Sequence, residues 1–331
     1  VHSFANDPER GLYLLVFIGI IIFISTSLFV LRISSIKSKL AIKKFSKQSF
    51  ISLNNIIFGA LIFSVMLGVT YPLIYEYLFD QKISIGAPFY NAIFIPIVIL
   101  ASFFLSFSVD SKWSRNSSFS FLKKPIFLSL ILSMTSTLFV MIFFSTKNIP
   151  ILLSVFVGLL IIYRYIYEII NYFLYKKFIN PFSVIAHMSL GLLIVSISFN
   201  SLLSSERAIN IYINEYEEYK DLKILFQDLG VEEKSNYDSI KAKFLVEDIK
   251  GNKFNLNPEK RKYFTRGQIT TETAIHVTPL RDIYMTIGDQ LDDGSWIVNI
   301  QINYLIRWIW ISALLMGLAG IMLIFSKKLR A

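Results

Sequence analysis

Long apolar runs separated by short polar segments dominate the pattern along this chain. A helix needs roughly 20 mostly apolar residues to cross a bilayer core of about 30 Å. Runs of that length cover residues 12–31, 53–74, 89–108, 126–144, 150–173, 183–203 and 305–325. The pattern therefore predicts a mainly α fold, a polytopic bundle of about seven transmembrane helices.

Residues 204–304 follow a different pattern, because apolar and polar positions alternate in short runs such as AKFLVEDI, TAIHVT, IYMTIG and WIVNIQI. Alternation of this kind is typical of half-buried β-strands. Gly251–Asn252 and Asp293–Gly294 mark turns between such runs. Residues 215–235 are left open between helix and loop. We expect a small, mainly β domain, long enough for a core of its own.

Three parts follow from these patterns. Residues 1–203 form a membrane domain with six transmembrane helices, and residues 204–304 form the β-rich domain, inserted before the last span. Residues 305–331 hold the final transmembrane helix and a basic tail.

Basic residues between the spans predict the orientation of the chain in the membrane. The segment 32–50 holds six lysine and arginine residues and no acid. Lysine and arginine also dominate the loops near residues 112–124 and 176–177 and the tail at 327–330. Since cytoplasmic loops are enriched in these residues, we expect that side to be cytoplasmic. The N-terminus and the β domain then face outward, and the C-terminus faces inward.

The composition of the chain excludes several kinds of chemical site. The sequence has no cysteine, which excludes disulfides, thiolate metal sites and cysteine nucleophiles within this chain. The net charge of +10 lies mainly in short loops between spans, so we expect contact with membrane lipid and no nucleic-acid partner. No phosphate-binding loop, zincin helix or nucleophile elbow is present in the sequence.

His187 is the first candidate site residue. It stands about one turn into the sixth span, where a polar side chain requires a partner. Two interpretations stay open: a hydrogen bond to a neighbouring helix, or axial ligation of a heme iron by a neutral imidazole. Three small neighbours would let a flat macrocycle approach: Ala186, Ser189 and Gly191.

Other polar residues are weaker candidates. His2 lies in the polar stretch before the first span, and His276 lies in a β-like run; on pattern alone, each is an ordinary loop or sheet histidine. Arg164 and Glu168 share a helix face at i,i+4 spacing and predict an ion pair, with a contact from Arg164 to a heme propionate as the alternative.

A cationic cluster lies in the β domain beside Tyr263 and Phe264 and comprises Lys260, Arg261, Lys262 and Arg266. It predicts either a solvated turn or a docking surface for a partner domain or an anionic group.

Three segments carry a resemblance to the CcmF family of cytochrome c-type biogenesis proteins. GVTYPLIYEYLFDQKISIGAPFYNAIFIPI is similar to the family's G-T-x-x-P-L and K-I-S-V-G-x-P-Y-F-N region. SVIAHMSLGLLIVSISFNS resembles its M-V-x-A-H-x-G-L span, and NPEKRKYFTRGQITTETAI with the segment that begins RDIYMTIGDQ resembles its C-terminal signature. The similarity runs in collinear order over the whole chain.

The resemblance implies a function. The family acts as a heme lyase of the Ccm pathway (System I), taking heme from a CcmE-type chaperone and attaching it through thioether bonds to apocytochrome c. CcmH-type proteins handle the apocytochrome thiols. The implied location is the bacterial inner membrane.

Site residues are also implied by the resemblance. The family holds a substrate heme between two periplasmic histidines and a structural b-type heme between two membrane histidines. His2 in VHSFANDPERG matches one periplasmic ligand, and His187 in the A-H context matches one membrane ligand. Both would be axial ligands of heme iron, and His2 would act in catalysis.

The chain also departs from the family. The family's WWD segment and the first histidine of each pair are absent, so the resemblance covers the C-terminal half. Since the sequence does not begin with methionine, we expect a fragment or one product of a split gene, which contributes to a lyase complex and is inactive alone. The rival interpretation is a membrane scaffold or transporter subunit without enzymatic activity.

Overall fold

A computed structural model describes residues 8–35, 46–108, 111, 113, 124–176, 179–265 and 267–325 of the protein. Within these ranges, seven helices are long and apolar enough to cross a membrane, which confirms the predicted spans. They are α1 (Pro8–Arg32), α2 (Lys47–Phe79), α3 (Ala87–Ser108), α4 (Lys124–Phe143), α5 (Ile149–Tyr175), α6 (Pro181–Leu203) and α7 (Ile306–Phe325). A short 3-10 turn, Ile33–Ser35, follows α1.

Capping residues fix where several helices begin. The Ser46 hydroxyl accepts the Ser49 N–H at 3.2 Å, so α2 starts six residues before the predicted span. Asn180 caps α6 in the same way, accepting the Phe182 and Ser183 N–H groups at 3.1 and 3.3 Å. Pro181 stands at the first position of α6, where a missing N–H costs nothing.

Prolines within the spans leave the helices continuous. Pro72 lies inside α2 and Pro96 inside α3, and neither splits its helix into two. The broken helices that many secondary transporters use are therefore not found at these two prolines.

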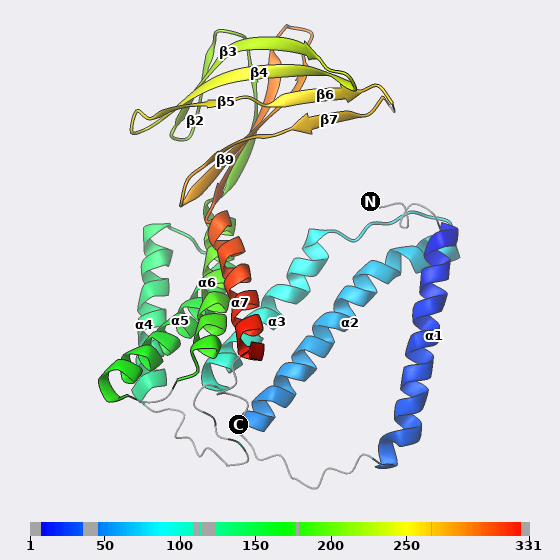
Figure 1. Ribbon diagram of the computed structural model, residues 1–331, viewed down its shortest axis with the longest axis vertical. Coiled ribbons are helices and arrows are strands. Elements are labelled where there is room, and N and C mark those ends of the chain that lie inside the picture. The colour runs from blue at the N-terminus through cyan, green and yellow to red at the C-terminus, as the bar shows by residue number, and fades with distance from the viewer. Residues whose placement is uncertain are drawn as a thin grey trace. The chain divides into compact units, whose positions relative to one another are not determined.

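The β domain between α6 and α7 consists of two antiparallel sheets, as Figure 1 shows. One sheet has the order β1-β10-β9-β8; the other has the order β2-β3-β4-β6-β7, with β5 also paired to β4. The strands of the first sheet are β1 (Ser205–Ile211), β8 (Ala274–Val277), β9 (Arg281–Gln290) and β10 (Trp296–Tyr304). Those of the second are β2 (Tyr216–Tyr219), β3 (Leu222–Glu233), β4 (Tyr237–Asp248), β5 (Lys253–Leu256), β6 (Glu259–Tyr263) and β7 (Ile269–Glu272).

The domain core lies between the two sheets. Phe226 of β3 and Phe244 of β4 stack with ring centroids 4.5 Å apart, and both are fully buried. Ile300 of β10 and Met285 of β9 close the core from the other sheet. Alternating strand residues therefore meet in one apolar layer, as the sequence pattern predicted.

The structure corrects the sequence interpretation of residues 215–235, because this segment forms β2 and β3 instead of a helix or a loop. Leu222, Ile224 and Phe226 are buried at every second position of β3. This period of two places them in the core only if the segment is extended, and pairing with β4 stabilises that form over eleven register positions.

The chain divides into two compact units, residues 1–179 and 180–331. The second unit holds α6, the β domain and α7. Since β1 follows α6, β10 precedes α7, and these strands pair, the two helices lie side by side (Figure 1). The Asn200 amide donates to the Tyr304 carbonyl at 2.7 Å, and the Tyr304 N–H donates to the Ser204 hydroxyl at 3.0 Å.

Candidate functional site

His187 lies in the second turn of α6, and its ring is anchored to the helix backbone. Nδ1 is 2.6 Å from the Ser183 carbonyl oxygen and 3.2 Å from the Ser183 hydroxyl. Because a carbonyl oxygen only accepts, Nδ1 carries the proton and donates it. In the neutral ring the lone pair is then on Nε2, and this tautomer is the one that ligates a metal through Nε2.

The donor set around His187 fits one axial position of a heme. Ser189 and Gly191 are buried on the same helix, and Ala186 and His187 are half-buried. Small side chains let a flat ring approach a helix closely, and one neutral imidazole supplies one ligand to iron. His276 is the only other histidine that the structure describes, so a second histidine on α1 to α7 is absent from the described residues.

Arg164 of α5 confirms the predicted ion pair. Its Nη1 is 2.8 Å from the Glu168 Oε1, and the Arg164 side chain is fully buried. The guanidinium also lies 5.8 Å from the centre of the Tyr167 ring. Arg164 belongs to the first unit and His187 to the second. The propionate contact stays a prediction.

The cationic cluster is divided between two faces of β6. The strand alternates, so Lys260 and Lys262 point to one face and Arg261 to the other. Lys260 pairs with Asp289, and Arg261 pairs with Glu259 and lies 3.4 Å from Glu272.

Arg261 is also held from its other side. Its guanidinium lies 4.9 Å from the centre of the Tyr237 ring. The Glu259 carboxylate is the main reason that the pKa of Arg261 is raised. Among the described residues of the cluster, Lys260 and Arg261 are thus each paired with a carboxylate and lie on separate faces of β6. Arg266 lies outside the described residues.

His276 is a sheet histidine of β8, in line with one interpretation of the sequence. Its ring stacks on Phe254 of β5 with centroids 3.6 Å apart and planes 12° from parallel. Burial lowers the pKa of His276, and the positive charge of Arg281 lowers it further. The neutral ring is thus the favoured form in the fold.

Arg281 was not singled out in the sequence, yet it connects distant parts of the domain. Its Nη1 is 2.5 Å from an Asp221 carboxylate oxygen, 60 positions away in sequence. The junction with α7 is similar: the Trp308 indole N–H donates to the Pro279 carbonyl at 2.9 Å, and Arg307 lies 3.5 Å from Asp282. Sequence separation hides these pairs, because no local spacing signals them.

His2 lies outside the described residues, so its role as a candidate heme ligand stays a prediction. The described residues hold no cluster of three or more histidine, aspartate or glutamate side chains of the kind that holds a metal ion.

Comparisons with known proteins show which family the chain resembles. Residues 202–303 match the family model described as the CcmF C-terminal beta-sandwich. The whole chain aligns with the cytochrome c-type biogenesis protein CcmF of Haemophilus influenzae at 28% identity and of Escherichia coli at 27%. The CcmF of Pseudomonas aeruginosa is 26% identical over the whole chain.

The chain spans about half the length of these relatives: 52%, 52% and 51%, respectively. A solved structure named cytochrome c heme lyase CcmF superposes with a TM-score of 0.68 at 16% identity, over 85% of this chain and 46% of that one. The likeness extends the fold assignment beyond the β domain to most of the chain.

Proposed function

We propose that the chain handles heme in cytochrome c maturation, as the C-terminal half of a heme lyase, because residues 202–303 match a CcmF family model and the whole chain aligns with CcmF proteins. The observation that carries the proposal is the alignment of the entire chain with CcmF proteins, including the β domain that a CcmF family model describes. The seven spanning helices support a multi-pass membrane location. The proposed membrane is the bacterial inner membrane, with the β domain in the periplasm.

His187 is the proposed axial ligand of a heme b within the membrane. Its Nδ1–H is fixed on the Ser183 carbonyl, which orients the ring and places the lone pair of the neutral ring on Nε2, the atom that would ligate iron. Gly191, four residues further along the same face of α6, adds no side chain to that face. A heme bound there would supply an iron centre that exchanges single electrons.

Arg164 is the proposed partner of a heme propionate. A guanidinium binds carboxylates in a two-point geometry. The ion pair with Glu168 orients the Arg164 side chain.

The proposed reaction joins heme, as substrate, to apocytochrome c. Each cysteine thiol adds across one heme vinyl group: sulfur bonds to one vinyl carbon and the proton to the other. The addition is redox-neutral, and the thiols come from the apocytochrome because this chain has no cysteine. His2 is the proposed ligand that holds the substrate iron, with CcmE-type and CcmH-type proteins as partners.

A Soret spectrum tests the role of His187. The chain is purified together with the remainder of its complex, and we expect His187→Gly to lose the band of the membrane heme. Added imidazole should restore it, since free imidazole can replace the missing ligand. His276→Gly, a histidine change outside the membrane helices, is the matched control and should leave the band unchanged. An unchanged band in His187→Gly contradicts the assignment.

The yield of holocytochrome c tests His2. We expect His2→Ala to lower the yield, and added imidazole to restore part of it. A wild-type yield from His2→Ala would rule out its proposed role while leaving the assignment of His187 untouched.

A further inference from the structure

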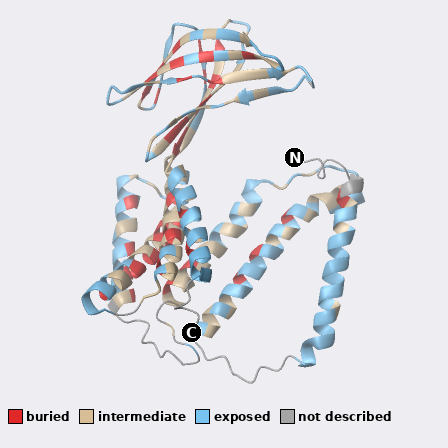
Figure 2. Cartoon of the chain, viewed as in Figure 1, coloured by how far each residue is buried: buried red, intermediate tan, exposed pale blue. Residues whose placement is uncertain are grey.

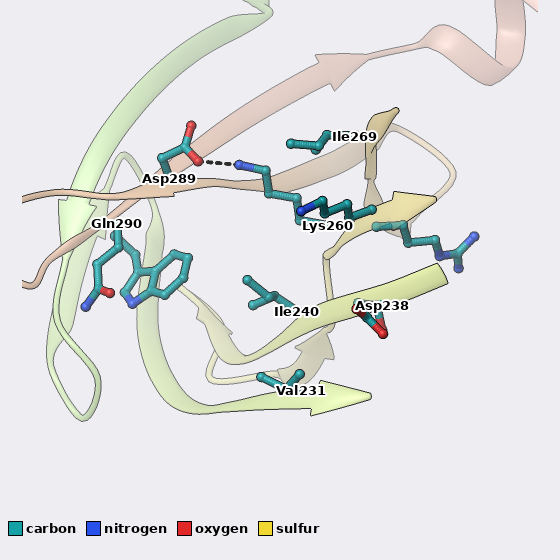
Figure 3. Close-up of a pocket in the computed structure, with 11 residues that line it drawn as sticks. Val231, Asp238, Ile240, Lys260, Ile269, Asp289 and Gln290 are labelled. Atoms are coloured by element: carbon teal, nitrogen blue, oxygen red, sulfur yellow. Dashed lines mark hydrogen bonds and ion pairs between the residues drawn. The ribbon is translucent and has the colours of Figure 1, made fainter. Parts of the chain in front are cut away.

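A cavity of about 400 Å³ opens at one end of the β domain, and Figure 3 shows the side chains that line it. Its walls come from β3, β4, β6 and β7 on one side and from β9 and β10 on the other. The apolar part of the lining consists of Val231, Ile240, Ile269 and Trp296. Val231 and Ile269 are 70% and 56% exposed, so the cavity continues the apolar core into open solvent.

Strand register brings apolar and charged side chains together on this face. One row across the sheet runs Val231, Ile240, Lys260, Thr271, and the next runs Glu233, Asp238, Lys262, Ile269. Residues in one row share a face of the sheet and are neighbours. The cavity face thus carries apolar side chains, the two lysines of β6 and the carboxylates of Glu233 and Asp238, with Asp238 directly opposite Lys262.

Lys260 is the cation best placed to meet a ligand. Its side chain is only 17% exposed, whereas that of its partner Asp289 is 82% exposed. Figure 3 shows the two side chains facing each other at the cavity, with Ile269 close by. An exposed carboxylate contributes little to such a pair, so another carboxylate entering the cavity can replace Asp289.

The backbone of β7 offers a second kind of contact. The Tyr263 N–H bonds to the Gln268 carbonyl, and in an antiparallel pair such bonded positions recur every two residues. Thr270 therefore directs its backbone groups toward β6, and Ile269 and Thr271 direct theirs outward. Among the strands that the structure describes, β7 pairs with β6 alone, so this outer edge carries unpaired donors and acceptors.

We propose that an extended segment of a partner protein, alternating apolar and acidic residues, adds to β7 as a further strand. Its backbone pairs with Ile269 and Thr271. Every second side chain then lies beside Ile269 and Thr271 on the cavity face, with an apolar one against Ile269 and a carboxylate within reach of Lys260. Charge favours this occupant, because Lys260 and Lys262 of β6 lie nearer to a strand added at β7 than Asp238 of β4 does. The inference is independent of the heme ligands proposed above.

Binding of a synthetic peptide tests the proposal. The probe is a fluorescein-labelled heptapeptide, Thr-Ile-Thr-Glu-Thr-Ile-Thr, and the protein is the full chain in lipid nanodiscs. Its isoleucines and glutamate share one face when extended, in either direction of pairing. We expect saturable binding by fluorescence anisotropy. Absence of binding up to millimolar chain concentrations overturns the proposal.

Two variants separate the contacts. Lys260→Glu should weaken binding at least about tenfold, because it opposes the carboxylate. Thr271→Pro removes an outward N–H from an edge strand, where proline is tolerated, and should weaken binding by a similar factor of about ten. Lys243→Glu is the matched control, since Lys243 is an exposed lysine of β4 outside the cavity lining, and should change binding less than about twofold.

Peptide variants keep the test sharp if a protein variant fails to fold. A peptide with alternate N-methyl groups keeps every side chain but loses backbone donors, and we expect it not to bind. Replacing its glutamate by lysine should abolish binding as well. Equal binding of the N-methylated peptide overturns strand addition, and equal binding of the lysine peptide overturns the role of Lys260.

Discussion

The β domain and the first helix contain similar apolar residues but expose them very differently. Ile224, Phe226 and Val246 of the β domain are fully buried. Phe23 of α1 is 73% exposed, and none of the most apolar stretch of α1 is buried inside the protein. Figure 2 shows this contrast as red inner strand positions against a blue α1. The domain buries its apolar surface itself, whereas α1 requires lipid or another chain to cover it.

The buried share of the apolar stretch also differs from helix to helix. In α5 and α6, 39% and 33% of the apolar stretch is buried, against 0% in α1. These two helices carry the candidate residues Arg164 and His187. Polar groups in a span need protein partners, which explains why the candidates lie on the best-covered helices.

The largest expected effect concerns the sandwich core. Phe244→Ala should lower the stability of the β domain by about 3–5 kcal/mol, because it leaves a cavity against Phe226. Thermal unfolding followed by near-ultraviolet circular dichroism measures the loss. The matched control is Ile249→Ala at a position that is 81% exposed, where the change should be below about 0.5 kcal/mol. Equal losses would contradict a closed core.

The second-largest loss of stability is expected for the Arg164–Glu168 ion pair of α5. Glu168→Ala should destabilise the helical unit by about 1.5–3 kcal/mol, the range for a hydrogen bond to a charged group, because buried Arg164 loses its carboxylate. Thermal melting in nanodiscs gives the shift. Glu168→Gln keeps an acceptor oxygen and should lose less. A shift as large in Glu168→Gln would mean that charge matters more than the hydrogen bond.

The third-largest loss of stability is expected where α2 packs closely on α3. A methyl group at Gly68 would lie 2.7 Å from the Tyr90 hydroxyl, so Gly68→Ala should cost about 1–3 kcal/mol by overpacking. Gly59→Ala on the same helix has no neighbour within 4 Å and should be neutral or stabilising. The same melting experiment compares them. If both variants melt alike, α2 and α3 do not pack through Gly68.

A smaller effect concerns acid sensitivity of the β domain. Because the pKa of His276 is lowered in the fold, the unfolded chain binds more protons as the pH falls below about 6.5. His276 therefore contributes stability above that pH that is lost as the pH falls through its folded pKa. Melting between pH 7.5 and 5 should show the decline, and His276→Phe, which keeps a ring on Phe254, should reduce it. An identical decline in His276→Phe would assign the effect to other groups.

The smallest effect is expected on α1. Phe23→Ala removes an exposed ring that contacts no core. The free energy of unfolding of the helical unit, measured by thermal melting, should therefore fall by less than about 0.5 kcal/mol. A loss comparable with that of Phe244→Ala would show that another protein surface, and not lipid, covers this face.

Local patterns in the sequence were sufficient for the spans and for the Arg164–Glu168 pair. A run of apolar residues has one stable form in a bilayer, because a helix satisfies its own backbone hydrogen bonds. Spacing at i,i+4 places two side chains on one helix face whatever surrounds them. Both inferences depend on residues near in sequence, and the structure confirms both.

Residues 215–235 show where local pattern was not enough. Glu217, Glu218 and Lys220 suit a helix or a loop, whereas pairing of β3 with β4 makes the segment extended. Similarly, Lys260 and Asp289 are 29 positions apart, and the stack of His276 on Phe254 joins two different sheets. No local spacing in the sequence predicts such contacts.

The chain of amino acids thus specifies which segments cross a membrane, where the β domain begins and which histidine lies in a span, because each follows from short-range periodicity. Folding in three dimensions adds the tautomer of His187, the division of the β6 cations between two faces and the cavity beside the β7 edge. These features arise from sheet register and from hydrogen bonds formed in the folded backbone, which bring together groups that the sequence separates.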